Sequence, residues 1–519
     1  MWDGVRRKAV ACAFALLVSG ATLAPTAFAQ EATPVVEAVV APPVQGAEGS
    51  AVAVVAATAQ VSAPEVVVAP PAPAANKADT TWMMISTVLV LIMIVPGLAL
   101  FYGGLVRTKN MLSVLMQVST VTVIGMMLWA FVGYSLTFTD GGPLNSWIGG
   151  ASRFFLLDNG TDLSDNLAAT FSTGVYIPEI VFVCFQMTFA CITAALVLGG
   201  LAERVKFIGI VLFSIVWPLL VYYPIAHMVW FWPGPDAVAN DPDNISAGFV
   251  WAKGALDFAG GTVVHINAGI AALMGAIVLG PRHGYDRKPI PPHSLTMTLI
   301  GTGLLWFGWF GFNAGSNLEA NYYAGLAMAN TFLATAAAGF SWMLTEWLTK
   351  GKPSLLGMCS GIVAGLVAVT PAAGFAGPVG AIALGLLVSP VCIFFVSFVK
   401  SLLGYDDTLD VFGIHCVGGI VGALATGVLV NPALGGAGIV DYTTCLTDGD
   451  ISTCDALPYD LVTQMTAQGT GVLVTLLWSG AISLVIFGLL RITGLLRAPK
   501  EHEEEGLDLP GHGEVAYNM

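Results

Sequence analysis

The amino-acid sequence predicts an all-α polytopic membrane protein of eleven transmembrane helices with a five-plus-five inverted repeat. Three observations support this fold class. Of the 519 residues, 56% are hydrophobic and only 10% are charged, whereas a water-soluble chain carries roughly 25% charged residues. Apolar segments long enough to cross a bilayer recur along the chain, and two of them repeat one histidine-centred pattern. The composition excludes a water-soluble globular protein, and so few basic residues argue against a nucleic-acid partner.

The N-terminus has the pattern of a secretory signal. Basic residues at Arg6–Lys8 precede an apolar run, Ala9–Val18, and the small residues of Ala27–Ala29 provide a cleavage site, so we expect a signal peptide over 1–29. The alternative is a first transmembrane helix, but the run is too short to span a bilayer. Residues 30–78 are rich in Ala, Val and Pro. Because proline interrupts helices, this segment is predicted to be a disordered extracytoplasmic extension.

The apolar segments define the membrane domain, which we expect to occupy residues 79–497. A span needs about 20 mostly apolar residues. The acidic remainder, 498–519, is predicted to be a cytoplasmic regulatory tail. Predicted spans lie near 81–105, 112–138, 178–201, 205–230, 257–280, 294–316, 323–348, 355–372, 377–401, 411–430 and 466–492.

The distribution of basic residues predicts the orientation. If the N-terminus is exported, 13 of the 19 Lys and Arg residues lie in inner segments and only three, Lys77, Arg153 and Lys253, lie outside. The signal holds the other three. This bias predicts an outer N-terminus and an inner C-terminus in the cell (inner) membrane. It also places Cys445 and Cys454 in an outer loop, where an oxidising compartment favours a disulfide between them.

Glycine is frequent inside the predicted helices as well as in loops. Gly357, Gly361 and Gly365 stand four residues apart on one helical face. Small residues at this spacing allow two helix backbones to approach closely in a membrane. We therefore expect this face to pack tightly against another helix.

The two repeated histidine segments suggest the inverted repeat. His265–Ile270 and His415–Ile420 both read His-x-x-x-Gly-Ile, and an acid precedes each, Asp257 and Asp410. Two halves of five helices insert with opposite orientation, because five is odd. Inverted repeats are typical of solute-moving membrane folds, with the site near the bilayer midplane. Coincidence among glycine-rich helices remains the alternative.

The two histidines are predicted to lie within the apolar slab. Helix rise places His265 roughly 12 Å inward from Asp257, and His415 roughly 6–8 Å from the inner start of its helix. An intramembrane ring nitrogen is costly without a partner, so we expect both rings to line a pore. Two separately satisfied packing histidines, or a pair of haem ligands in a redox enzyme, are alternatives. Asp257 and Asp410 are predicted to cap the helices that carry the histidines.

Aromatic residues form a second predicted site at the outer ends of three helices. Phe185, Trp230 and Ser316 are expected at the outer mouth, with Phe189 and Phe312 one turn deeper. Aromatic faces and a hydroxyl can hold a small cation, and deeper phenyl rings can block hydrated ions. Aromatic residues near a membrane interface more often form a belt, so spacing leaves this choice open. Trp309 lies below them on the helix of Phe312.

These residues lie in stretches that resemble the ammonium transporter (Amt/Mep/Rh) family, on its bacterial Amt branch. The resemblance covers residues 78–518. It departs from the family in the long Ala/Val/Pro leader, in an extended loop between the second and third helices, and in extra residues at 232–249. The matching stretches are Pro96–Gly104, Phe189–Thr193, Gly254–Asn267, Gly308–Ser316, Gly351–Gly357, Asp410–His415, Gly506–Asp508 and His512–Asn518.

The resemblance implies an eleven-helix transporter, not an enzyme, with one pore in each subunit of a homotrimer and with no cofactor or metal. It also implies that a PII-type nitrogen regulatory protein contacts the inner loops and tail. It assigns ammonium recruitment to Phe185, Trp230 and Ser316, the pore gate to Phe189 and Phe312, the pore lining to His265, His415 and Trp309, and a structural role to Asp257.

Physical chemistry favours loss of a proton before the solute crosses. Ammonium resembles potassium in charge and size, so carbonyl coordination would separate the two poorly. An apolar pore rejects any ion that cannot shed its charge, and ammonium can. We therefore expect capture outside, deprotonation near Phe189 and Phe312, and passage of ammonia along His265 and His415. The residues leave open whether the histidines bind ammonia or relay the proton, and an ammonium sensor signalling through its tail is the alternative function.

Overall fold

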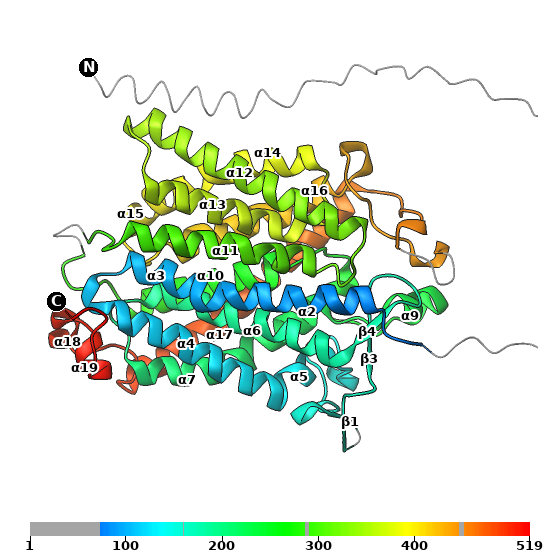
Figure 1. Cartoon of the computed structure of the whole chain (residues 1–519), viewed down its shortest axis with the longest axis horizontal. Helices are drawn as coiled ribbons and strands as arrows, with labels where there is room; N and C mark the ends of the chain where they lie inside the picture. Colours follow the sequence, from blue (N-terminus) through cyan, green and yellow to red (C-terminus); the bar gives the residue numbers. More distant parts are fainter. Residues whose placement is uncertain (1–72, 159, 286–289, 446–450, 519) are drawn as a thin grey trace, which may run out of the picture. The chain divides into compact units, whose positions relative to one another are not determined.

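The computed structural model describes residues 73–518 except 159, 286–289 and 446–450. The signal peptide predicted over 1–29, and the predicted extension up to residue 72, lie outside the described residues. The contacts divide the chain into two units, Met1–Ala72 and Pro73–Met519, and everything below concerns the second unit. Long helices run side by side through it (Figure 1).

Five predicted spans form the first half of the bundle, most of them as helices broken into consecutive pieces. The pieces of one span follow each other directly and meet at short π-helical stretches. The label η marks both these stretches and the 3-10 turns. The bounds are α2 (Lys77–Ile92), η2 (Met93–Leu98) and α3 (Ala99–Leu105); η3 (Thr108–Asn110, a 3-10 turn), α4 (Met111–Leu128), η4 (Trp129–Gly133) and α5 (Tyr134–Phe138); α6 (Glu179–Leu201); α7 (Phe207–Trp217), η7 (Pro218–Tyr222) and α8 (Tyr223–Trp230); and η10 (Gly261–Ile266) with α10 (Asn267–Leu279).

The remaining six spans and the tail follow the same plan. The bounds are α11 (Leu295–Gly315); α12 (Tyr322–Lys350); α13 (Leu355–Val369) with the 3-10 turn η11 (Thr370–Ala372); α14 (Pro378–Phe394), η12 (Phe395–Val399) and α15 (Lys400–Leu403); η13 (Phe412–Cys416) with α16 (Val417–Leu429); α17 (Leu461–Ile492); and, in the tail, α18 (Lys500–Glu505) and α19 (Asp508–His512).

The predicted all-α membrane fold is confirmed. Ten helices in the described part of the chain are long and apolar enough to cross a membrane. The predicted span 323–348 is also helical, as α12, but it is not among those ten. Its sequence is rich in Ala and Thr, which lowers its apolar character. The count of eleven transmembrane helices therefore stays a prediction.

The first helix starts earlier than predicted, at Lys77 instead of residue 81. Asn76 caps it, because the side-chain oxygen of Asn76 accepts hydrogen bonds from the backbone amides of Ala78 and Asp79. An Asn at this position satisfies amides that the first helical turn leaves unpaired. The predicted boundary at residue 79 thus falls inside helix α2.

The four described strands are short and lie in one outer connection. They form two antiparallel two-stranded sheets. The bounds are β1 (Leu157–Asp158), β2 (Thr161–Asp162), β3 (Leu167–Ala169) and β4 (Tyr176–Pro178). Together with helix α9 (Pro235–Asn240) they mark one end of the bundle, whereas α15, α18 and α19 mark the opposite end (Figure 1). Following the predicted orientation, we call these ends outer and inner.

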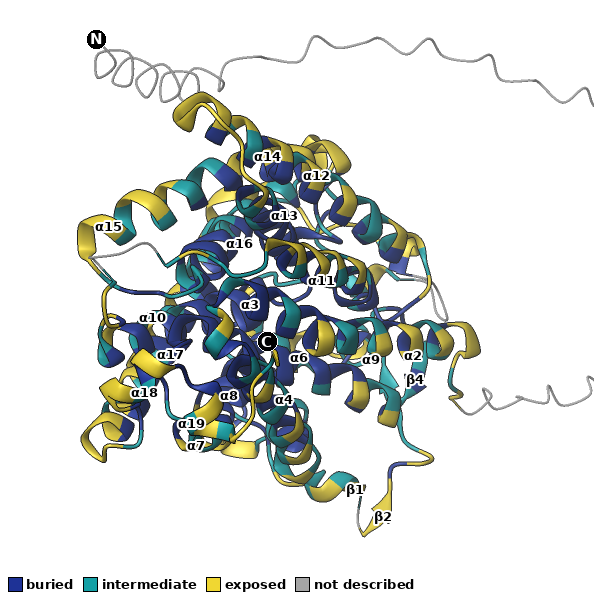
Figure 2. Cartoon of the chain, turned by 60° about the vertical axis from the view of Figure 1, so that its left-hand side comes forward, coloured by how far each residue is buried: buried dark blue, intermediate teal, exposed yellow. Residues whose placement is uncertain are grey.

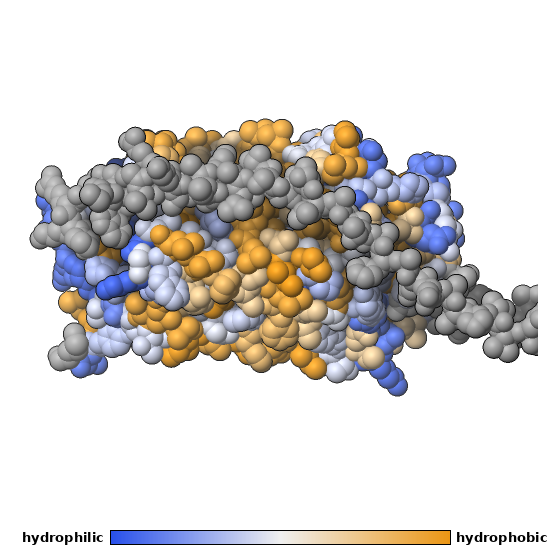
Figure 3. Space-filling view, turned by 90° about the horizontal axis from the view of Figure 1, so that it is seen from above, coloured by the Kyte–Doolittle hydropathy of each residue, from blue (hydrophilic) through white to orange (hydrophobic). Residues whose placement is uncertain are grey.

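The surface between the two ends is apolar. Figure 3 shows a hydrophobic band across the middle of the molecule and hydrophilic residues toward both ends. Large apolar side chains of the predicted spans, such as Val123, Phe332 and Leu477, are at least half exposed. Buried residues gather instead on central helices such as α3, α10 and α16, while α12, α14 and α15 expose more of their surface (Figure 2). Such a band is expected where lipid is the solvent.

The glycine stripe of α13 packs against α12, as predicted. A Cβ atom added at Gly361 would lie 2.5 Å from Cβ of Trp342, and one at Gly365 would lie 2.6 Å from Cβ of Ala338. Real Cβ atoms essentially never approach this closely. The two helices can therefore lie this near to each other only because glycine has no side chain.

The tail folds onto the inner end of the bundle. The carboxylate of Asp508 accepts hydrogen bonds from the backbone amides of Leu112 and Ser113, in the first turn of α4. Arg497 forms an ion pair with Glu503 at 2.6 Å, and the amide of Leu507 donates to Asn110 Oδ1. The segment predicted as a regulatory tail is thus built into the inner surface.

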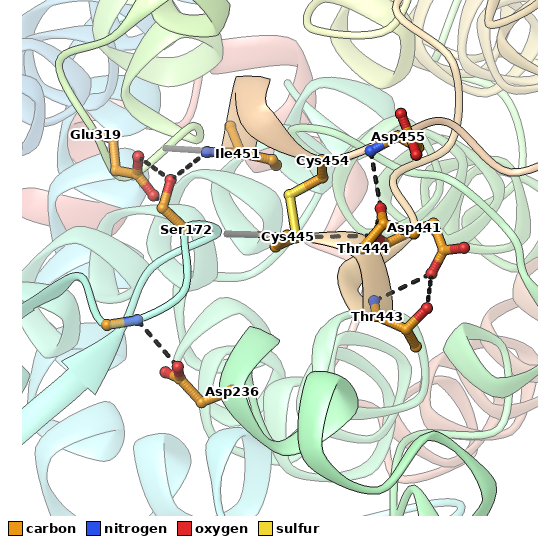
Figure 4. Close-up of a disulfide and its surroundings, with 11 residues drawn as sticks. Ser172, Asp236, Glu319, Asp441, Thr443, Thr444, Cys445, Ile451, Cys454 and Asp455 are labelled. Atoms are coloured by element: carbon orange, nitrogen blue, oxygen red, sulfur yellow. Dashed lines mark hydrogen bonds between the residues drawn. A yellow bond between two sulfur atoms is a disulfide. The ribbon is translucent and has the colours of Figure 1, made fainter. Parts of the chain in front are cut away.

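The outer loop after α16 contains a disulfide between Cys445 and Cys454. Figure 4 shows how this loop reaches a neighbouring loop: the backbone amide of Ile451 donates to Ser172 Oγ at 2.8 Å. Ser172 in turn donates from its hydroxyl to Glu319 Oε2 at 2.7 Å. Glu319 lies three residues after Ser316, so the disulfide loop is linked to the loop that carries the predicted outer site.

Candidate functional site

The outer start of the first histidine helix is organised by Asp257. Its carboxylate accepts hydrogen bonds from the backbone amides of Gly260, Gly261, Thr262 and Val263, and from the hydroxyl of Thr262. These amides are the donors that a helix start leaves unpaired, and the helix dipole favours a negative charge there. Asp257 thus has the geometry of a helix cap, as its position in the sequence suggested.

The inner start of the second histidine helix is capped by a different residue from the one predicted. Asp410 has φ of 59°, and its carboxylate pairs with Lys400 Nζ at 2.7 Å. Asp407 is the cap, because its Oδ2 accepts the backbone amide of Phe412 at 2.7 Å. The capping role predicted for Asp410 is therefore wrong. The left-handed turn at Asp410 directs its side chain to Lys400, which the sequence pattern could not reveal.

With Asp407 as the inner cap, the two halves match each other more closely than they do with Asp410. Asp257 stands eight residues before His265, and Asp407 stands eight residues before His415. Each histidine lies in a π-helical stretch, η10 or η13, at the start of its helix. The first helix starts beside Trp230, at the outer end of α8, and the second starts beside Lys400 of α15, at the inner end, as an inverted repeat requires.

His265 lies nearer to its helix start than the sequence estimate implied, whereas His415 lies at the depth that was estimated for it. Helix η10 begins at Gly261, because residues 257–260 form a loop around the Asp257 carboxylate. His265 is therefore about 6 Å along the helix axis from its start, instead of about 12 Å. His415, four residues after Val411, lies at about the same depth from the inner end.

The two histidine rings contact each other. His415 Nδ1 lies 3.3 Å from His265 Nδ1, with ring centroids 5.3 Å apart. Both rings are buried, at 1% and 5% exposure. Two nitrogen acceptors cannot form a hydrogen bond, so one Nδ1 must carry a hydrogen and the other must accept it. The histidines are therefore one coupled pair, in contrast to two separately satisfied packing residues.

A narrow cavity runs along this pair. Met93 and Leu305 contribute to its wall, and its polar groups come from the two histidines and Trp309. The indole of Trp309 donates to Thr370 Oγ1 at 2.9 Å, whereas His265 Nε2 has no hydrogen-bond partner among the described residues. The lining residues are Met93, Leu98, Phe101, Ile192, Leu196, Val264, His265, Leu305, Trp309, Phe312, Val363 and His415.

Two phenyl rings lie on the outer side of the cavity. Phe189 of α6 and Phe312 of α11 are stacked with centroids 4.3 Å apart, and both are buried. Phe312 also lies against His265, at 6.0 Å between centroids. With no more than van der Waals space between stacked rings, a hydrated ion cannot pass them in this conformation.

The predicted recruitment residues surround the outer side of those rings. Phe185 packs edge-on against Phe189 at 4.9 Å, and Trp230 does so at 5.8 Å. The indole of Trp230 donates to the backbone carbonyl of Asp257, which links this site to the capped helix start. Ser316 donates its hydroxyl to the carbonyl of Phe312 at 2.7 Å, and its lone pairs remain available. Ring contacts thus connect seven of the eight predicted site residues, Phe185, Phe189, Trp230, His265, Trp309, Phe312 and His415. Ser316 lies one turn after Phe312 on the same helix.

The outer aromatic rings and the inner cavity differ in the kind of solute that they can bind. The outer side offers aromatic faces that can attract a cation. The inner side is an apolar cavity whose ring nitrogens can hydrogen-bond a small polar molecule. No group of three or more His, Cys, Asp and Glu side chains that could hold a metal ion occurs in the described part of the chain.

Sequence comparison relates the chain to known membrane transporters. The sequence model of the Ammonium Transporter Family matches residues 81–517. A protein described as an ammonium transporter of Aquifex aeolicus is 44% identical over 441 residues, which cover 85% of this chain and 93% of that protein. An ammonium transporter of Bacillus subtilis is 41% identical over 439 residues, covering 85% of this chain and 98% of the relative.

Structure comparison agrees with the sequence comparison. The crystal structure of Saccharomyces cerevisiae Mep2 is similar, with a TM-score of 0.70 and 31% identity, over 86% of this chain and 94% of that one. The solved structure of a protein named Sensor Amt Protein has a TM-score of 0.69 and 27% identity, and the match covers 84% of this chain and 98% of that one. The sequence relatives are named as transporters and not as enzymes.

Proposed function

Because this chain belongs to the ammonium transporter family, we propose that it carries ammonium nitrogen across the membrane as ammonia, after removing a proton. One observation supports this mechanism above all. The stacked pair Phe189 and Phe312 lies between the aromatic outer site and the histidine pair. A cation can be bound outside this pair, but only a small neutral molecule suits the apolar cavity inside it.

The outer site recruits ammonium through Phe185, Trp230 and Ser316. The ring faces attract the cation, and the Ser316 oxygen accepts one of its N–H groups. Cation–π attraction is worth roughly 0.5–2 kcal/mol, more where water is excluded. This is enough to concentrate ammonium weakly at the mouth, and weak binding allows release toward the pore.

Deprotonation follows from the cost of moving charge into the cavity. Burying an isolated ion among apolar side chains is far more costly than burying a hydrogen-bonded neutral amine. Ammonium avoids this cost by leaving its proton behind, which potassium cannot do. The phenyl pair moves aside for ammonia, which then forms hydrogen bonds with the ring nitrogens of His265 and His415.

The histidine pair also provides a relay for the proton. A proton taken up at the unpartnered Nε2 of His265 can displace the hydrogen on Nδ1 toward His415 Nδ1, 3.3 Å away. His415 can then release its own Nε2 hydrogen. Each ring nitrogen exchanges one hydrogen, so the pair returns to a neutral state with its tautomers reversed.

The test is flux through a variant without the relay. We expect His265→Ala combined with His415→Ala to lower ammonium-evoked current and internal pH change in proteoliposomes by at least roughly 100-fold. His283→Ala, at a half-exposed inner histidine, is the control and should conduct normally. Flux at the wild-type level in the double variant would refute the mechanism.

The assembly and setting follow from the family resemblance. The protein acts as a homotrimer with one pore per subunit, in the cell inner membrane, with its N-terminus outside after signal cleavage and its C-terminus inside. The excess of basic residues in the inner loops supports this orientation. A PII-type regulatory protein binds the inner loops and the tail.

A sensor function is the second candidate. The tail is packed against α4 and the inner loops through Asp508, Arg497 and Leu507, and one structurally similar protein is named Sensor Amt Protein. A tail in contact with the bundle can respond to the state of the pore. A signal through the tail in the absence of ammonium flux would favour the sensor function. Ammonium flux in the absence of a regulatory protein would favour transport.

A further inference from the structure

Asp407, which caps the helix of His415, differs from Asp257, which caps the helix of His265, in the hydrogen bonds that its carboxylate accepts. Asp407 is 1% exposed. Its Oδ2 accepts the amide of Phe412, but its Oδ1 has no hydrogen-bond partner among the described residues. Asp257, at the matching outer position, has both oxygens occupied by five donors. A buried carboxylate oxygen without a partner is costly when ionised, so Asp407 can take up a proton more readily than Asp257.

The groups that face Asp407 come from several elements. Lys400 of α15 donates from Nζ to the backbone carbonyl of Asp407 and pairs with the Asp410 carboxylate. Tyr102 of α3 and Arg204, in the loop after α6, interact electrostatically with Asp407. Tyr405 precedes it by two residues and also interacts with it.

The balance of these groups favours a protonatable carboxyl near neutral pH. Burial raises the pKa of Asp407 to about 6, and the Asp410 carboxylate acts in the same direction. The Lys400 ammonium and the backbone amides of Phe412 and Val411 act in the opposite direction, because they stabilise the carboxylate. A group with a pKa close to the pH of its surroundings can both accept and release a proton.

We propose that Asp407 is the inner proton acceptor of this transporter, which receives on Oδ1 the proton released by the histidine pair and passes it to the inner solution. The inference deepens the proposed function and rests on it. Asp407 lies in the loop before the helix that carries His415, eight residues before that histidine, and accepts an amide of the first helical turn. It therefore lies on the inner side of the histidine pair. The carboxylate of Asp410 is turned instead to Lys400.

The protons of one transfer balance. Ammonium loses one proton, which His265 takes up at Nε2, and becomes ammonia; one hydrogen then passes from His265 Nδ1 to His415 Nδ1. The Nε2 hydrogen released by His415 converts Asp407 from carboxylate to carboxylic acid, and both rings regain their starting tautomers before the next transfer. Asp407 then returns the proton to ammonia or water on the inner side and becomes a carboxylate again. One ammonium ion, with its charge, is transferred in total.

The inner pH dependence has a defined sign. Asp407 accepts a proton only as a carboxylate, so current should be present when the inner pH is above about 6 and should be lost as it falls through this value. A change of outer pH at constant inner pH should not produce this acid limb.

The experiment compares Asp407→Asn with Asp460→Asn in proteoliposomes of the full chain, recording current and luminal pH together. The Asn side chain can still accept the Phe412 amide but cannot take up the proton. We expect Asp407→Asn to lower the current roughly 100-fold and to abolish its inner acid limb. Asp460 caps α17 by accepting the amide of Thr463 and is exposed, so Asp460→Asn should leave the current unchanged.

The outcomes separate this inference from the proposed function. Wild-type current and pH profile in Asp407→Asn would overturn it, as would ammonia flux without current in the wild type, which leaves transport itself standing. No ammonium flux in the wild type would overturn both. If Asp407→Asn does not reach the membrane, Asp407→Glu decides: a shifted acid limb supports the role of Asp407 and an unshifted one contradicts it.

Discussion

At the scale of single residues, a carboxylate at a helix start can serve either structure or chemistry, and its donors decide which. Asp257 accepts five hydrogen bonds, and its backbone carbonyl holds the indole of Trp230. It therefore holds both the loop before His265 and the side chain of Trp230, one of the predicted recruitment residues. Asp407 accepts fewer hydrogen bonds, and its Oδ1 has no hydrogen-bond partner among the described residues.

Asp257→Ala should therefore damage the protein more than the loss of an ordinary cap. It leaves four backbone amides and one hydroxyl without their acceptor, and each buried unsatisfied group costs about 1–3 kcal/mol. We expect lower thermal stability in detergent and ammonium uptake close to background. Asp257→Asn, which keeps one acceptor oxygen, should recover part of the stability. Wild-type stability in Asp257→Ala would contradict this interpretation.

At the scale of elements, close contact between α12 and α13 depends on glycines that carry no chemistry. Helix α12 is the predicted span that is least apolar, yet it lies against α13 along the stripe of Gly357, Gly361 and Gly365. In a membrane, where lipid is as apolar as leucine, such packing replaces the hydrophobic effect between helices. The stripe thus explains how a helix rich in small and polar residues has a defined place in the bundle.

Gly361→Ala should destabilise this contact. Its Cβ would lie 2.5 Å from Cβ of Trp342, and overpacking of this kind costs typically about 1–3 kcal/mol. We expect a lower midpoint of thermal unfolding in detergent. Gly488→Ala on α17 is the matched control, because a Cβ there meets nothing within 4 Å and alanine favours the helix. Equal midpoints for the two variants would argue against tight packing at Gly361.

At the scale of the whole described unit, the tail connects the inner surface to the bundle. Asp508 accepts two amides at the start of α4, and Glu503 pairs with Arg497. A change in the tail can therefore alter the inner end of α4 without passing through the pore. Such a contact suits regulation, because it is a small set of polar interactions at the inner surface, with Glu503 and Asp508 both buried.

Deletion of residues 500–519 should separate regulation from transport. We expect the truncated protein to keep ammonium uptake in proteoliposomes and to lose binding of a purified PII-type regulatory protein in a pull-down. Removal of residues 514–519 alone keeps α18 and α19 and serves as the control. Unchanged PII binding after the longer deletion would count against the regulatory role, and loss of uptake would show that the tail supports the pore.

The sequence by itself determined the membrane class, ten helical spans to within a few residues and the helical nature of the eleventh segment, because length and apolar composition are local properties of the chain. It also identified His265, His415 and the aromatic residues as candidates, through spacing and family resemblance. The family itself is confirmed by comparison with known transporters.

Only the tertiary structure decided which of these residues meet. The contact between the two Nδ1 atoms joins residues 150 positions apart, and the stacking of Phe189 on Phe312 joins two helices from different halves. The tertiary structure also identified Asp407, and not Asp410, as the inner cap, because the left-handed backbone at Asp410 turns that side chain to Lys400. Helix formation depends on near neighbours, whereas the direction and partner of a side chain depend on backbone and packing that distant segments provide.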